Sequence, residues 1–92
     1  MANADLTGAN LSLANLDDAW LIGANLDKAN LTGANLTDAN LYGANLAGAY
    51  LTAANLAGAD LRFANLDEAN LTDVIGADFT GAVNVPERYR KD

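Results

Sequence analysis

The sequence predicts a solenoid of short tandem repeats, in which the chain bends once per repeat around a common axis. A leucine recurs at every fifth position over most of the chain, and an alanine stands two positions before each leucine. Five residues advance about 140° around a helix, so the leucines would form no apolar stripe on it. On a flat strand, an odd period would send successive leucines to opposite faces. A bend in every repeat brings all of them to one axis.

Fourteen tandem repeats fill residues 4–73 without a break. Each repeat reads Ala-Asx-Leu followed by two variable residues, where Asx is Asn or Asp, with Trp20 and Tyr50 as the two exceptions at the Asx position. Constant positions are expected to face inward and variable positions outward. The predicted inward core consists of Leu6, Leu11, Leu16, Leu21, Leu26, Leu31, Leu36, Leu41, Leu46, Leu51, Leu56, Leu61, Leu66, Leu71 and Phe79.

Glycine marks the expected turns. Seven of the eight glycines occupy the second position after the central residue of a repeat. Glycine adopts positive φ without a steric penalty, so this placement predicts a turn in each repeat.

The unit Ala29-Asn30-Leu31-Thr32-Gly33 and its thirteen companions resemble the pentapeptide-repeat family. The resemblance covers residues 4–73, and residues 77–81 more loosely. It implies an all-β fold: a right-handed quadrilateral parallel β-helix with four repeats per coil, and therefore about four coils. Two rows of residues spaced twenty apart favour such a coil, namely Ser12, Thr32, Thr52 and Thr72, and Ile22, Tyr42 and Arg62.

The chain is expected to form one repeat domain, residues 1–83, and a capping segment, residues 84–92. Within the domain, residues 74–76 are a three-residue insertion before the repeat at 77–81, which we interpret as a bulged corner with Phe79 facing inward. The segment 84–92 has helix-start signals, with Asn84 as N-cap, Pro86 near the first turn and Glu87 three residues after the cap. A short helix covering the last coil is therefore predicted.

The N-terminal coil has no comparable cover, because Met1-Ala2-Asn3 is too short. An open coil end leaves leucines and strand edges exposed, and strand edges recruit other strands. A homodimer that joins two N-terminal ends around a two-fold axis would hide both defects and then stop growing.

The chain is acidic, with a formal net charge of −7. Residues 1–81 contain ten acidic residues against Lys28 and Arg62, a net charge of −8. Such a surface argues against direct nucleic-acid binding, which depends on cationic side chains. Polar residues interrupt every apolar run, so no membrane span is expected. A cytoplasmic location is the simplest interpretation, and an exported protein whose leader has been removed is the alternative.

The residue types argue against catalysis. The chain has no histidine and no cysteine, the commonest bases, nucleophiles and metal ligands. No catalytic residue, metal ligand or cofactor is therefore assigned, and no enzyme is expected. The acidic pairs Asp17–Asp18 and Asp67–Glu68 leave one alternative, a weak Ca²⁺-binding surface, because oxygen ligands suit that ion.

One side of the square is the candidate interaction surface, formed by Trp20, Ile22, Tyr42, Arg62 and Phe63. Outward aromatic residues beside an arginine are typical of protein interfaces, although scattered apolar surface residues are also ordinary. The expected function is a non-enzymatic structural or protein-interaction module with an unknown protein partner. The resemblance also implies a runner-up, an acidic mimic of DNA that binds DNA gyrase or a topoisomerase.

Overall fold

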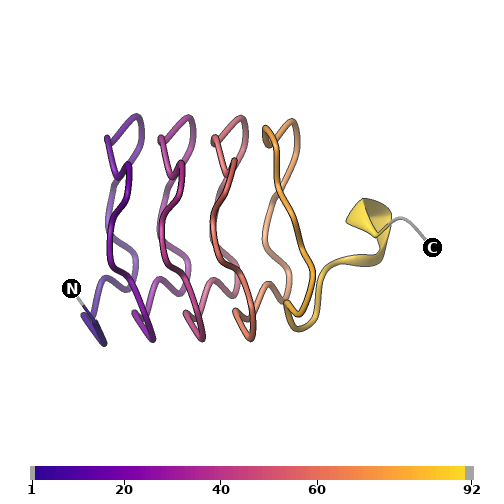
Figure 1. Cartoon of the computed structure of the whole chain (residues 1–92), viewed down its shortest axis with the longest axis horizontal. Coiled ribbons are helices and arrows are strands. Elements are labelled where there is room, and N and C mark those ends of the chain that lie inside the picture. The colour runs from indigo at the N-terminus through magenta and orange to yellow at the C-terminus, as the bar shows by residue number, and fades with distance from the viewer. Residues whose placement is uncertain (1, 91–92) are drawn as a thin grey trace.

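The chain forms a stack of parallel coils, which a computed structural model describes for residues 2–90 (Figure 1). Successive coils lie side by side along the longest axis, and the two ends of the chain lie at opposite ends of the molecule. The overall dimensions are 33 × 22 × 21 Å. Parallel bridges join residues twenty positions apart, beginning with Asp5 and Asn25. This offset confirms the predicted twenty-residue coil.

Each repeat contains one β-turn that redirects the chain. From Ala9 to Ala69, the N–H of each repeat alanine donates to the C=O of the leucine three residues earlier, as between Ala34 and Leu31 (3.0 Å). The third residue of each turn has a positive φ, as a type II turn requires. Four such turns in twenty residues give the coil its square outline, in agreement with two nearly equal short dimensions of 22 and 21 Å.

Three hydrogen bonds per repeat join neighbouring coils in the repeats from Leu6 to Leu51, and fewer join the repeats after them to the last coil. In the first repeat, the N–H groups of Leu6 and Gly8 donate to Asn25 and Asp27, and the N–H of Asn25 donates back to Ala4, at 2.8 to 2.9 Å. Each side pairs through a single bridge before the next turn, so the described residues contain isolated bridges rather than longer strands. The bridge residues follow the Asx position from Asp5 to Asn70, and then Ile75 and Val83.

The leucines fill the axis of the stack. All eleven from Leu21 to Leu71 are at most 2% exposed, and the alanines from Ala24 to Ala69 lie beside them. Within residues 2–90, no polar or charged side chain is buried. Leu6, Leu11 and Leu16 of the first coil, and Phe79 near the other end, are only partly buried against this core. Burial therefore falls at both ends of the stack.

The end of the repeat region differs from the bulged corner expected at 74–76. Val74 and Ile75 take the ordinary Ala and Asx places, and Ile75 pairs with Asn55 at the usual offset of twenty. Asn65 then pairs with Val83, an offset of eighteen. The segment from Ile75 to Val83, called the shortened side below, is therefore two residues shorter than its counterpart in the preceding coil rather than bulged. At the start of this shortened side, Gly76 lies close to Ala57 of the preceding coil: a Cβ at Gly76 would lie 3.0 Å from the Ala57 Cβ. Glycine allows this approach.

The C-terminal helix is shorter than predicted and begins later. It is a single 3₁₀ turn, η1 (Glu87–Tyr89), preceded by Pro86 at the N-cap position with no side-chain cap. Asn84 is not the N-cap, because its φ is 59° and its Nδ2 donates to Asn65 Oδ1 (3.2 Å). So few residues gain too few hydrogen bonds to support an α-helix alone. Residues 91 and 92 of the expected segment lie outside the described residues.

Candidate interaction surface

The five predicted surface residues come from one side of three successive coils, at 19–23, 39–43 and 59–63. The bridges from Trp20 to Asn40 and from Asn40 to Asp60 fix the register of this side. Ile22, Tyr42 and Arg62 each lie two residues after one of these bridge residues, so they form a column across the three coils. Trp20 and Phe63 are 61% and 62% exposed, Tyr42 is 39% exposed, and Ile22 is half-buried. The side presents large apolar groups to solvent.

The two rings at the centre of this surface pack against each other. The centroids of Tyr42 and Phe63 lie 5.3 Å apart with an interplanar angle of 62°, an edge-to-face arrangement. The Arg62 Cζ lies 5.4 Å from the Tyr42 centroid, within cation–π range. The three side chains therefore hold one another in position before any partner arrives.

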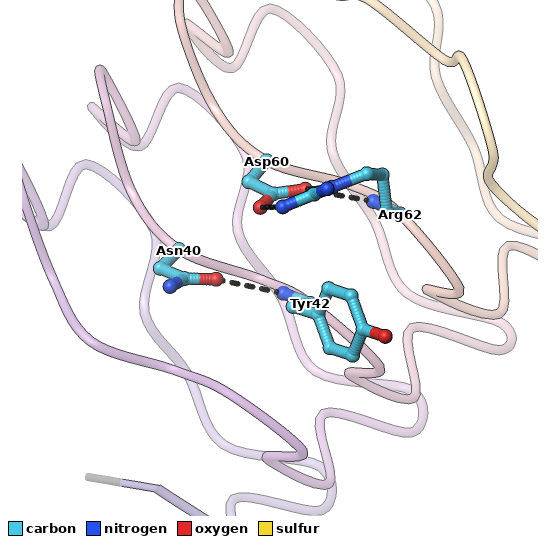
Figure 2. A network of polar contacts seen from close by, with 4 residues as sticks. All are labelled: Asn40, Tyr42, Asp60 and Arg62. Carbon is cyan, nitrogen blue, oxygen red and sulfur yellow. Dashed lines mark hydrogen bonds and ion pairs between the residues drawn. The ribbon is translucent and has the colours of Figure 1, made fainter.

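Arg62 is also held by an ion pair with Asp60 (Figure 2). Its Nε and Nη2 donate to Asp60 Oδ1 and Oδ2 at 2.9 and 2.8 Å. The hydrogen bonds from the Arg62 side chain and backbone lower the pKa of Asp60, and the same contact raises the pKa of Arg62. The arginine side chain is 62% exposed, so the pair adds little stability. Its effect is to fix the guanidinium and balance its charge.

The Asx side chains stabilise the turns, a role that the sequence reasoning missed. Figure 2 shows the Tyr42 N–H donating to Asn40 Oδ1 (3.1 Å), and the same bond recurs between Arg62 and Asp60. Thr7, Thr32, Thr37 and Thr80 add a second bond from the hydroxyl to the same oxygen, as from Thr37 to Asn35 (2.6 Å). These are Asx turns. Twelve of the fourteen tandem repeats keep an Asx residue at this position although it does not enter the core.

Trp20 lies on the same side, one coil before Tyr42. On three successive coils, Trp20 is itself a bridge residue, Tyr42 lies two residues after the bridge residue Asn40, and Phe63 lies three residues after the bridge residue Asp60. They therefore form a diagonal row across the coils rather than a column. At about 4.8 Å per coil and 3.3 Å per residue, the Trp20 and Tyr42 backbones are roughly 8 Å apart along this diagonal.

Three carboxylates gather at the corner that precedes this side. Asp17, Asp18 and Asp38 are exposed, and each offers an oxygen within 4.8 Å of the others. The sequence indicated the pair Asp17–Asp18 but not Asp38, which the twenty-residue offset places one coil after Asp18. Ca²⁺ takes six to eight oxygen ligands, and one oxygen from each of these three exposed carboxylates supplies three of them.

Two open hollows lie at the C-terminal end. One of about 620 Å³ is lined mainly by small and apolar groups of the last coil, together with Tyr89 and Arg90. The other, of about 500 Å³, lies beside the second acidic pair, Asp67–Glu68, and is also lined by Asn84 and Arg88. Neither hollow contains residues of the predicted interaction surface.

Comparison with known proteins identifies the class. The chain matches the sequence profile described as pentapeptide repeats (8 copies) over residues 1–38 and 34–73. No curated protein matches it in sequence. Among residues 2–90, no helix is long and apolar enough to cross a membrane.

Three solved pentapeptide-repeat structures resemble the chain. HetL of the cyanobacterium Nostoc sp. strain PCC 7120, involved in heterocyst differentiation regulation, is 47% identical with a TM-score of 0.81, and the match covers 84% of this chain and 36% of HetL. A protein of the Arabidopsis thaliana thylakoid lumen is 30% identical with a TM-score of 0.78, over 95% and 68% of the two chains. Rfr23 of Cyanothece 51142 is 40% identical with a TM-score of 0.50, over 90% and 58%.

The fold is thus a right-handed β-helix of a generally non-enzymatic, structural class. The chain belongs to the pentapeptide-repeat family. It spans about a third of the length of HetL.

Proposed function

We propose that this chain is a non-enzymatic protein-interaction module that binds a protein partner through the side carrying Tyr42, Arg62 and Phe63. The observation that carries the proposal is the preformed cluster on this side. Its two ring centroids lie 5.3 Å apart, and the Arg62 side chain is held by two hydrogen bonds to Asp60. Aromatic residues and arginine are enriched at the energetic centres of protein interfaces.

The rigidity of the support favours binding. Tyr42 and Arg62 stand on backbone that is hydrogen-bonded to the coils on both sides and fixed by an Asx turn. Side chains that are ordered before binding lose less conformational freedom in the complex, so more of the contact energy appears as affinity.

The proposed module consists of about four coils, with residues 84–90 covering part of the last one. Val85 and Tyr89 pack against the core, and the Tyr89 hydroxyl lies 3.3 Å from Thr72 Oγ1. In this proposal the module acts in the cytoplasm. A regulatory role exerted through protein contact agrees with the involvement of HetL in heterocyst differentiation regulation.

Quantitative affinity capture from the source cell tests the surface. The chain carrying Tyr42→Ala and Phe63→Ala is compared with a control carrying Leu13→Ala and Tyr50→Ala, which removes two exposed apolar groups from another side. We expect a partner that wild type and control retain and that the first variant loses by about tenfold or more, a loss typical of interface hot spots. Equal retention by both variants would refute this surface as the binding site.

The alternative function is binding to DNA gyrase or a topoisomerase as an acidic mimic of DNA. The net charge of −8 over residues 1–81 favours it, whereas the aromatic side and Arg62 interrupt an acidic face. Inhibition of gyrase supercoiling by the purified chain, with an unchanged effect of the Tyr42→Ala, Phe63→Ala variant, would support the mimic over the aromatic surface.

A further inference from the structure

We infer that the partner offers this side a basic segment, whose apolar side chains pack on Tyr42 and Phe63 while a lysine or arginine lies beside Asp17, Asp18 and Asp38. The inference rests on the proposed function and specifies the chemistry of the partner. Its basis is the combination of exposed rings with an uncompensated negative charge at the adjoining corner.

The charge balance of this side favours a cationic partner. Arg62 is paired with Asp60 and leaves no free positive charge there. The oxygens of Asp17, Asp18 and Asp38 approach within 4.8 Å of one another, so their charges repel. A partner cation placed among them replaces this repulsion with attraction, whereas a neutral partner leaves it and an acidic partner increases it. Nucleic acid is disfavoured for the same reason.

The corner and the rings are close enough for one segment to contact both. Asp18 precedes Trp20 by two residues, and Asp38 precedes Tyr42 by four. The N–H of Asp38 donates to the C=O of Ala57 (2.8 Å), which holds this corner against the next coil. The diagonal row of rings therefore begins with Trp20, beside the carboxylates, and ends with Phe63, farther from them.

The apolar part of the partner follows from the exposed area. Trp20 and Phe63 are each more than half exposed, although the rings are aligned across three coils. Contact with aliphatic or aromatic side chains removes this surface from water. A cation without apolar neighbours would gain the electrostatic attraction only, and salt would screen it.

Trp20 provides a direct readout, because it is the one tryptophan of the chain and lies within the proposed contact. Its fluorescence is followed during titration with three synthetic peptides of equal length, alternating Leu with Lys, Gln or Glu. We expect the Lys-Leu peptide to bind at least about tenfold more tightly than the Gln-Leu peptide at low salt, and the Glu-Leu peptide to give no change.

Matched variants separate the corner from the overall charge. Asp17→Asn, Asp18→Asn and Asp38→Asn together remove three charges at the corner, and Asn tolerates the positive φ at 18 and 38. Asp67→Asn, Glu68→Gln and Asp73→Asn remove three charges elsewhere. We expect the corner variant to weaken Lys-Leu binding by about tenfold or more and the control by less than about threefold.

The outcomes distinguish this inference from the proposed function. If the Lys-Leu and Gln-Leu peptides bind equally and Tyr42→Ala with Phe63→Ala abolishes both, the surface stands and the basic partner is refuted. If both triple charge variants weaken Lys-Leu binding equally, and Tyr42→Ala with Phe63→Ala leaves it unchanged, attraction to the whole acidic body explains the binding. The inference is then overturned. Failure of the ring variant to alter partner capture from cells instead refutes the proposed function.

Discussion

Within the repeats at 4–73, eight residues other than glycine stand at the third position of a turn with a positive φ, among them Leu13, Ala53 and Phe63. A left-handed backbone costs an L-residue roughly 1–2 kcal/mol. The turns form regardless, because the leucine before each turn is held in the axis and the coils on either side fix the backbone. Tertiary structure therefore overrides local preference at these residues.

Alanine substitutions at Gly76 and Gly43 can separate the cost of a positive φ from the cost of a steric contact. Both have a φ of 68°, but a Cβ at Gly43 meets nothing within 4 Å, whereas one at Gly76 lies 3.0 and 3.2 Å from Ala57 Cβ and Cα. We expect Gly43→Ala to destabilise by roughly 1–2 kcal/mol from backbone strain alone. Gly76→Ala should lose about 1–3 kcal/mol more from the contact. Urea unfolding measures both, and equal losses would show that the approach to Ala57 does not control the shortened side.

We expect the stability of the fold to decrease in acid because carboxylates serve as turn acceptors. Hydrogen bonds from the Thr80 hydroxyl and backbone lower the pKa of Asp78, as bonds from Thr7 lower the pKa of Asp5. A lowered pKa in the folded state gives stability that is present above the unfolded value of about 3.9 and is lost as the pH falls through the folded value.

We therefore expect the melting temperature to fall below about pH 4. Asp78→Asn keeps an oxygen for Thr80 but cannot titrate, so its melting temperature should fall less steeply with acid than that of wild type. Thr80→Val removes the main cause of the pKa shift and should also reduce the slope. Melting curves between about pH 3 and 7 measure these slopes, and parallel curves for all three proteins would contradict the assignment.

At the scale of the element, a leucine in an inner coil is stabilised by the coils above and below it, whereas a leucine in the first coil has a neighbouring coil on one side. In the row Leu16, Leu36 and Leu56, the first is partly exposed and the other two are at most 1% exposed. The same residue type therefore contributes differently according to its coil.

Alanine substitution along this row should show that gradient. Leu36→Ala and Leu56→Ala leave a cavity between coils and should each cost about 2–5 kcal/mol. Leu16→Ala removes a side chain that is already partly hydrated and should cost roughly 1 kcal/mol. Chemical denaturation gives the three values. A uniform loss would mean that the open face of the first coil is covered in solution.

The five-residue period and the row of leucines were readable from the sequence because every repeat repeats the same contacts. The shortened side was not, because it depends on Gly76 passing Ala57, a contact between coils. The helix signals at Asn84 and Glu87 were misleading, because Asn84 instead bonds to Asn65. On the interaction surface, the period placed the five residues on one side, but only the structure brought Asp60 to Arg62 and Asp38 to Asp18.

At the scale of the whole molecule, the two ends differ. Val85 and Tyr89 pack on the last coil, whereas no described residue covers the partly buried Leu6, Leu11 and Leu16 of the first coil. The acidic body opposes association, because two like-charged bodies must meet. Contact through the apolar end and charge repulsion thus act in opposite directions.

For the isolated 92-residue chain, we propose a homodimer that joins two N-terminal coil ends, with association that strengthens as salt increases. Light scattering over a concentration series at two salt levels measures it. Leu11→Gln should weaken the dimer, whereas Leu13→Gln, at a side chain that is 81% exposed, should not. A mass of 9.5 kDa at every concentration and both salts would refute the dimer.

The twenty-residue offset between paired residues also determines how the molecule responds to force. Within residues 2–90, each coil is bonded only to its immediate neighbours, so tension applied to the two ends of the chain loads one boundary between coils at a time. Detaching a terminal coil frees twenty residues, a contour length of roughly 70 Å when extended. The backbone bonds at that boundary are loaded in sequence around the square, as in a zipper, rather than together as in shear. The twenty-residue coils should therefore extend in equal steps at low force, and the mechanical resistance should not increase with the number of such coils.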